Sequence, residues 1–126
     1  VKTFKDLVAG RGSKRLVTVK KNQTIAEAID MMKKFEIENV PVMDGEEIVG
    51  ALSEGGLFNK IINNPEIKSE TISSVMEKPY PLVSFDTTVE RLSSLITKDN
   101  GAVLSKDDSG YYHIVTKYDV IQSLAK

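Results

Sequence analysis

Cysteine is absent from this sequence, histidine occurs only once, and no long apolar run is present. Without cysteine, the chain has no disulfide bond and no thiolate for catalysis or zinc binding. The single histidine, His113, lacks the sequence partners of a metal site or a catalytic triad, so we expect a packing or surface role for it. No segment approaches the length of a transmembrane span, and no signal peptide opens the chain. We therefore expect a cytoplasmic protein without a membrane partner.

Neither sign of charge is in excess. The 126-residue chain has a net charge of −1, with 28% charged and 40% hydrophobic residues. This balance is ordinary for a globular domain and creates no general field that would attract nucleic acid. Basic pairs such as Lys20-Lys21 and Lys33-Lys34 are scattered and lack the interleaved aromatic residues of a nucleic-acid surface. A glycine-rich phosphate loop and a nucleophile elbow are also missing, which argues against catalytic residues in this chain.

What the sequence does contain is one pattern that occurs twice, with an offset of about 63 to 66 residues between the copies. Leu16–Val19 and Leu82–Phe85 have β-branched or aromatic character, which predicts a strand early in each copy. A helix, two further strands and a closing helix follow each of them, so both copies have the order β-α-β-β-α. The later strands are expected at 40–43 and 48–52 in the first copy, and at 102–105 and 112–115 in the second.

Capping signals and helical spacing support the two middle helices. Thr24 with Glu27, and Thr87 with Glu90, have the spacing of a capping box. Apolar residues then recur at the helical period, which predicts one buried face on each helix. A short amphipathic stretch precedes each copy, so we divide the chain into repeats at residues 1–64 and 65–126. These stretches contain Phe4, Leu7 and Val8 in the first repeat, and Ile72, Val75 and Met76 in the second.

The end of the last strand carries the most distinctive polar residues. Thr116 places a hydroxyl at the strand end, and the carboxylate of Asp119 follows three residues later at the start of a helix. One interpretation is a helix cap, with Thr116 at the N-cap and Asp119 favourably placed in the field of the helix. The other is a sugar site, in which the carboxylate accepts hydrogen bonds from a vicinal diol. The residues alone leave both interpretations open.

Taken together, the motifs resemble a tandem pair of CBS domains, the Bateman module. The marks are Val40–Asp44, Ile48–Ser53, Ser74-Val75-Met76 and the Thr116-x-x-Asp119 signature, in this order along nearly the whole chain. The resemblance implies an α/β fold of two β-α-β-β-α repeats that pack through their sheets with pseudo-twofold symmetry. It also implies a homodimer, since such pairs commonly associate.

The second half is more specifically similar to the C-terminal regulatory region of a cystathionine β-synthase. The similarity runs from Thr88 through Arg91-Leu92-Ser93 and Gly101–Leu104 to Ile114–Thr116. It implies a regulatory region, not an enzyme in its own right, and a pyridoxal-phosphate-dependent catalytic domain of cysteine biosynthesis elsewhere in the parent protein. Because the chain starts at Val1 and not at Met, we expect it to be a piece of such a protein. The expected effector is an adenosine-containing molecule, with S-adenosylmethionine the first choice and AMP, ADP or ATP the alternatives.

In that family the ligand crosses between the repeats. The resemblance implies that Thr116 and Asp119 hold the sugar, that Ile37 and Val40 sandwich the purine, and that Tyr118 covers the ring. The mirror position has Ser53 but replaces the acid with Gly56, so we expect one working site. The remaining implied contacts are Val17, Thr18 and Asn39.

Two alternatives to an S-adenosylmethionine sensor stay open. An adenine-nucleotide sensor would need a cation for the phosphate, and Lys117 is the candidate within the signature segment. The other alternative is a structural dimerisation module with a vestigial site. Gly56 supports it, because one of the two sites has already lost its acidic residue.

Overall fold

The computed structural model describes residues 1–11 and 16–124. The chain forms two compact units, each described separately below: unit 1 combines Val1–Leu16 with Tyr80–Lys126, and unit 2 is the continuous segment Val17–Pro79. These units differ from the repeats 1–64 and 65–126, which describe the duplication in the sequence and stay a prediction. The pseudo-twofold packing of the repeats also stays a prediction.

Unit 2 is a three-stranded sheet with two α-helices. The strand order is β1-β2-β3, in which β1 runs parallel to β2 and β2 runs antiparallel to β3. Apolar side chains from both helices and all three strands share one buried cluster, so the helices pack on the sheet through a common core. The elements are β1 (Val19–Lys20), α2 (Ile25–Phe35), β2 (Asn39–Asp44), β3 (Glu47–Ser53) and α3 (Glu54–Asn63), followed by the 3-10 helices Pro65–Ser69 and Ile72–Ser74.

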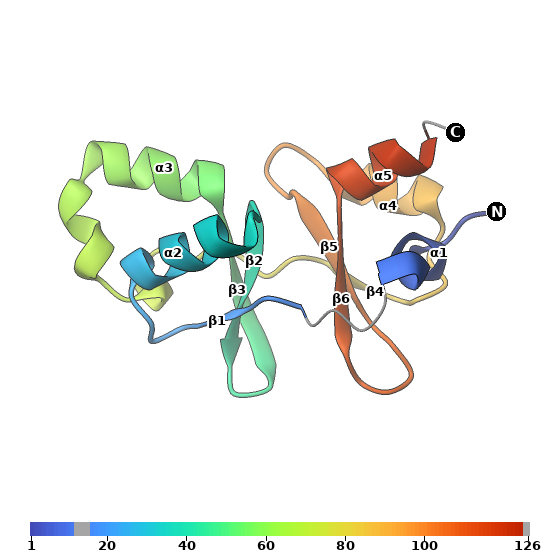
Figure 1. The fold of residues 1–126 in the computed structure, drawn as a ribbon, viewed down its shortest axis with the longest axis horizontal. Coiled ribbons are helices and arrows are strands. Elements are labelled where there is room, and N and C mark those ends of the chain that lie inside the picture. Colours follow the sequence, from blue (N-terminus) through green and yellow to red (C-terminus); the bar gives the residue numbers. More distant parts are fainter. Residues whose placement is uncertain (12–15, 125–126) are drawn as a thin grey trace. The chain divides into compact units, whose positions relative to one another are not determined.

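Unit 1 repeats this arrangement with the strand order β4-β5-β6, again parallel for the first pair and antiparallel for the second. The predicted β-α-β-β-α order is therefore confirmed in both copies, and the fold is mixed α/β (Figure 1). The elements are α1 (Phe4–Val8), a 3-10 turn (Ala9–Arg11), β4 (Leu82–Val83), α4 (Val89–Leu95), β5 (Ala102–Lys106), β6 (Tyr112–Thr116) and α5 (Lys117–Leu124).

The first strand of each copy is shorter than predicted. Val19 and Lys20 pair with Val42 and Met43, so β1 begins three residues after Leu16, the predicted start. In unit 1 only Leu82 and Val83 form β4. β1 and β4 are edge strands, and each pairs with one neighbouring strand. Only the residues that pair with this neighbour form a strand, so each strand is shorter than the apolar segment that predicted it.

The two middle helices begin in different ways. Before α2 the predicted capping box is present, because the Glu27 amide donates to Thr24 Oγ1 at 3.2 Å and the Thr24 amide donates to Glu27 Oε1 at 3.0 Å. Before α4 the predicted cap at Thr87 is wrong by one residue. The cap is Thr88, whose hydroxyl accepts from the Arg91 amide at 3.2 Å, while the Thr87 hydroxyl hydrogen-bonds that of Ser84.

The two amphipathic stretches pack with the opposite copy. Phe4 and Val8 of α1 lie in the core of unit 1, and the Phe4 amide donates to the Thr87 carbonyl at 2.8 Å. Figure 1 shows α1 beside the elements of the second copy, although its blue colour marks the other end of the chain. Conversely, Ile72 is fully buried in unit 2, and its amide donates to the Gln23 carbonyl at 2.8 Å. Unit 1 is therefore built from two separated segments.

The closing helices α3 and α5 leave part of their apolar surface exposed. Leu57 and Val120 are buried, whereas other apolar side chains of these helices face outward. Within the described ranges, no helix combines the length and the apolar character needed to cross a membrane. The exposed apolar side chains are Phe58 and Ile62 on α3, and Tyr118, Ile121 and Leu124 on α5.

Candidate functional site

The predicted site residues are divided between the two units. Unit 1 contributes Thr116, Tyr118 and Asp119, and unit 2 contributes the group that was predicted to face them. The pairing of the two groups around one ligand stays a prediction, and the geometry of each group follows within its own unit. The unit 2 group consists of Val17, Thr18, Ile37, Asn39 and Val40.

Thr116 and Asp119 meet at the junction of β6 and α5. Thr116 is the last residue of β6, and Asp119 lies in the first turn of α5. The Thr116 amide donates to Asp119 Oδ2 at 2.8 Å, and the Thr116 hydroxyl lies 3.3 Å from the same oxygen. The carboxylate thus caps the strand end through one oxygen, Oδ2, which holds the group in place for its second oxygen to bind another partner.

That second oxygen is paired with Arg11, a residue that the sequence interpretation missed. Arg11 Nη2 lies 2.7 Å from Asp119 Oδ1, and Arg11 Nη1 donates to the carbonyl of Ile114 on β6. The two side chains are 30% and 27% exposed, so the pair stands at the surface of unit 1. The sequence offered only a weak signal, an arginine directly after the first amphipathic stretch. A contact between residues so far apart in the chain is set by tertiary packing.

Tyr118 and Lys117 form a separate pair on α5. The Lys117 ammonium lies 5.3 Å from the centroid of the Tyr118 ring, within the range of a cation–π contact. Tyr118 is 57% exposed. The cation predicted to bind phosphate therefore lies over an exposed ring, and Arg11 is the cation beside the carboxylate.

In unit 2 a tight reversal after α2 brings Ile37 and Asn39 to the start of β2. Glu36 ends α2 with a left-handed φ of 53°, and the Ile37 amide donates to the Met32 carbonyl at 3.0 Å. Ile37 and Asn39 are half-buried, as are Val17 and Thr18. Their surface is therefore partly open to a ligand.

Val40 differs from the rest of this group because it is fully buried in the core of unit 2. The predicted contact of Val40 with a purine stays a prediction. The half-buried Ile37 retains exposed surface for such a contact.

The mirror junction between β3 and α3 has a different source of negative charge. The Gly56 amide donates to Ser53 Oγ at 3.1 Å, so the hydroxyl caps α3. A Cβ placed on Gly56 would lie 2.8 Å from Ser53 Oγ and 3.4 Å from Glu77 Oε1. Glu77 is held there by backbone hydrogen bonds with Ala51 at 2.9 and 3.0 Å, and its carboxylate lies 3.8 Å from Lys60 Nζ. The carboxylate of Glu77 therefore stands beside the space that an acid at position 56 would occupy.

His113 has a partner that the sequence interpretation did not find. Its Nε2 lies 2.8 Å from Asp107 Oδ2, and its ring centroid lies 5.4 Å from that of Phe85. The hydrogen bond from His113, together with backbone amides of the hairpin, lowers the pKa of the Asp107 carboxyl from its ordinary value. Among residues 1–11 and 16–124, no group of three or more histidines or carboxylates could hold a metal ion. The pair closes the β5–β6 hairpin, so His113 does have the packing role expected of it.

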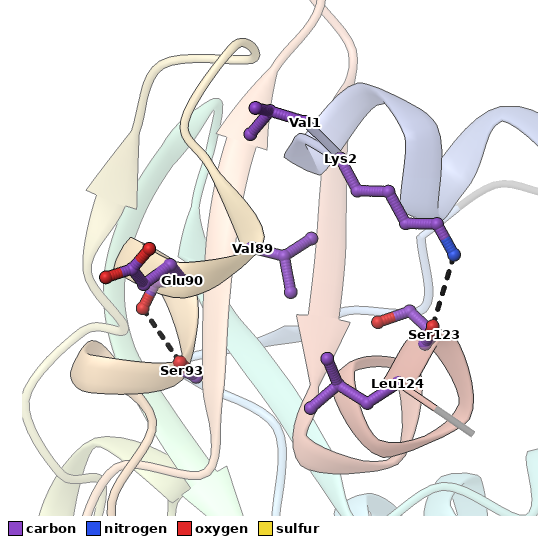
Figure 2. A pocket seen from close by; sticks show the side chains of 7 residues that line it. All are labelled: Val1, Lys2, Val89, Glu90, Ser93, Ser123 and Leu124. Carbon is purple, nitrogen blue, oxygen red and sulfur yellow. Dashed lines mark hydrogen bonds between the residues drawn. The ribbon is translucent and has the colours of Figure 1, made fainter. Parts of the chain in front are cut away.

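A hollow on unit 1 involves none of the predicted site residues. It has a volume of about 530 Å³ and lies between the chain start, α4 and α5 (Figure 2). Lys2 Nζ spans it by donating to the Ser123 carbonyl at 3.1 Å. Most of its lining is apolar, and among the described residues Lys2 and Glu90 are its charged members. The described lining residues are Val1, Lys2, Val89, Glu90, Ser93, Ser123 and Leu124.

Two comparisons relate this geometry to known proteins. The family model described as the CBS domain matches the chain twice, at residues 5–63 and 72–126. A solved structure of the CBS-domain-containing protein ATU1752 from Agrobacterium tumefaciens is similar with a TM-score of 0.85 and 22% identity, over 97% of this chain and 92% of that one.

Two further solved structures contain adenosine compounds. The CBS domain pair of protein MJ0100, in complex with 5'-methylthioadenosine and S-adenosyl-L-methionine, has a TM-score of 0.80 and 23% identity, over 98% of this chain and 100% of that one. CBSX2 in complex with AMP has a TM-score of 0.72 and 18% identity, over 98% and 96% of the two chains. At these identities the likeness shows the fold.

Proposed function

The chain belongs to the CBS domain family, and from that premise we propose that it is a regulatory module that binds an adenosine-containing ligand at Thr116 and Asp119. The observation that carries the proposal is the carboxylate of Asp119, fixed at the β6–α5 junction by the Thr116 amide. A vicinal diol has two hydroxyl donors, and a carboxylate held in this way is a suitable acceptor for both.

The remainder of the proposed site comes from unit 2. Ile37 would contact the flat face of the purine, and the backbone near Asn39 would read its edge. Val40 would contact the opposite face of the purine, and Val17 and Thr18, just before β1, would line the sugar side. These roles follow from the family resemblance, and the half-buried state of Val17, Thr18, Ile37 and Asn39 is consistent with them.

The proposed output is control of an attached catalytic domain, pyridoxal-phosphate-dependent and similar to cystathionine β-synthase. Support comes from the second half of the sequence, from Thr88 to Thr116. A ligand that contacts both repeats favours one arrangement of them, and the attached domain responds to that arrangement. Coupling of this kind is typically worth about 1–3 kcal/mol.

S-adenosylmethionine, the first choice from the sequence, and an adenine nucleotide are the two ligand classes. The contents of the MJ0100 and CBSX2 crystals support one class each. A specific observation favours the nucleotide, because the guanidinium of Arg11 lies 2.7 Å from Asp119 and would attract a phosphate. The sulfonium of S-adenosylmethionine would be repelled by the same cation.

We also propose a homodimer formed through exposed helix surfaces. The apolar residues Phe58 and Ile62 on α3 are 63% and 64% exposed, and Ile121 and Leu124 on α5 are 59% and 70% exposed. Exposed apolar surface of this kind is typical of association. A structural dimerisation module without ligand would use the same surface, so ligand binding separates the two functions.

Calorimetric titration of the chain with S-adenosylmethionine, AMP and ATP tests the proposal. We expect one ligand class to bind near one equivalent per chain, and Asp119→Ala to abolish that binding. Asp108→Ala is the matched control, because Asp108 is an exposed acid at the tip of the β5–β6 hairpin. No binding of any of the three to the wild-type chain would reject the sensor and leave the dimerisation module.

A further inference from the structure

We infer that Arg11 determines ligand specificity by passing from Asp119 to the phosphate of a bound adenosine nucleotide. The inference rests on the proposed adenosine site at Asp119. It makes the site selective for a phosphorylated adenosine over the uncharged nucleoside.

The carboxylate of Asp119 has few acceptor positions left for a ligand. An ionised carboxylate offers about four lone-pair positions. In the structure Oδ2 faces the amide and the hydroxyl of Thr116, and Oδ1 faces Arg11 Nη2 at 2.7 Å. About one position is left, and a vicinal diol has two hydroxyls to place. The diol therefore binds fully only when the guanidinium releases Oδ1.

The guanidinium of Arg11 needs a new partner once it has left Asp119. Arg11 Nη1 also donates to the Ile114 carbonyl, so the group stays anchored on β6 when Nη2 leaves Asp119. An uncharged nucleoside offers this cation no new anion and must break the ion pair without replacing it. A phosphate accepts two parallel hydrogen bonds from a guanidinium, so a nucleotide replaces the lost partner with a stronger one.

Lys117 is the other cation of the signature segment. Lys117 lies over the Tyr118 ring at 5.3 Å, and no ion pair joins it to a carboxylate among the described residues. Arg11 is 30% exposed, which gives its side chain freedom to turn toward a ligand at the surface of unit 1. Within residues 1–11 and 16–124, Arg11 is therefore the cation placed to distinguish AMP from adenosine.

The experiment compares calorimetric titrations of AMP and adenosine against the wild type, Arg11→Gln and Arg91→Gln. We expect AMP to bind the wild type more tightly than adenosine does. Arg11→Gln weakens AMP binding by about 10-fold or more, as expected for lost hydrogen bonds between charged groups. It leaves adenosine binding unchanged or stronger, because no ion pair has to be broken. Arg91→Gln, which removes an exposed arginine of α4, changes neither affinity.

The outcomes separate this inference from the proposed function. If both ligands bind the wild type and Arg11→Gln leaves the ratio of their affinities unchanged, the inference is overturned and the adenosine site stands. A variant that binds AMP more tightly also overturns it, since Arg11 would then only compete with the ligand. If neither ligand binds the wild type, the proposed function and the inference both fail.

A second measurement uses the wild-type chain alone and does not depend on the folding of a variant. Raising the salt concentration screens the attraction between a guanidinium and a phosphate at the surface. We expect AMP affinity to fall with salt while adenosine affinity does not. Equal salt dependence for the two ligands would overturn the inference.

Discussion

The β6–α5 junction of unit 1 and the β3–α3 junction of unit 2 have the same backbone design and different chemistry. Each has a hydroxyl at the strand end, Thr116 or Ser53, followed by a helix. In unit 1 the acid comes from the helix itself and its cation from Arg11. In unit 2 the helix has Gly56, the acid is Glu77 and its cation is Lys60.

This difference shows that a duplicated strand–helix junction does not by itself duplicate a site. Asp119 is bonded to the backbone of the strand end, so its position is fixed by local geometry. Glu77 reaches its junction from outside the β-α-β-β-α order, and its side chain is 48% exposed. Glu54 begins α3 and Glu77 stands beside Gly56, but only the β6–α5 junction has a carboxylate in the position of the family's signature acid.

The largest expected effect separates the two carboxylates. Asp119→Ala removes about two charge-assisted hydrogen bonds to a diol, at about 1.5–3 kcal/mol each, which predicts a loss of about 100-fold or more in ligand affinity. Glu77→Ala leaves the affinity within about 3-fold, because the carboxylate belongs to the other junction. Calorimetric titration of the two variants with the same ligand measures both. Equal losses would mean that the two junctions act as one site.

A smaller effect follows from adding the missing acid. Gly56→Asp places a Cβ 2.8 Å from Ser53 Oγ and a second carboxylate beside Glu77, so we expect a loss of about 1–2 kcal/mol in the free energy of unfolding. Glu77→Gln in the same chain should recover part of this loss, since it removes the like charge. Urea denaturation of the single and double variants measures the coupling, and Gly56→Ala separates the steric contribution from the charge.

This second comparison also tests whether the signature alone makes a site. If Gly56→Asp is as stable as the wild type and binds a second equivalent of ligand, the two junctions are interchangeable and the contrast between them is wrong.

The smallest effect concerns the starts of α2 and α4. The amide and the hydroxyl of Thr24 lower the pKa of Glu27 from 4.5, whereas the cap of α4 at Thr88 has no such acid partner. A lowered pKa in the folded state contributes stability above pH 4.5, and this contribution is lost as the pH falls through the folded value. We expect Tm to fall less steeply with decreasing pH in Glu27→Gln than in the wild type. In Glu90→Gln the fall of Tm should match that of the wild type. Thermal melts across the range measure this, and identical curves for the two variants would contradict it.

Elements that depend on interactions between neighbouring residues could be predicted from the sequence. The helical spacing of the first middle helix and the capping box at Thr24 depend on neighbours a few residues apart, and both appear in the structure. The cap of α4 was misplaced by one residue because Thr87 and Thr88 are adjacent and both suit that position.

Contacts between distant segments could not be predicted in this way. Arg11 with Asp119, Glu77 beside Gly56, and Phe4 in the core of unit 1 each join residues that no periodicity relates. The position of Phe4 before the first copy does not indicate that it packs with the second. Tertiary packing decides these contacts, and the Arg11–Asp119 ion pair joins residues too far apart in the chain for a local sequence pattern to mark it.

The packing of α1 has a consequence for the order in which the chain folds during synthesis. Unit 2 is continuous, from Val17 to Pro79, and has all of its core as soon as that segment has left the ribosome. Unit 1 needs Phe4 from the beginning of the chain and Val120 from α5, so it closes only after the last helix has emerged. The segment of unit 2 is therefore synthesised after α1 and before the elements of unit 1 on which the apolar face of α1 packs. Unit 1, which carries Asp119, is therefore completed after unit 2.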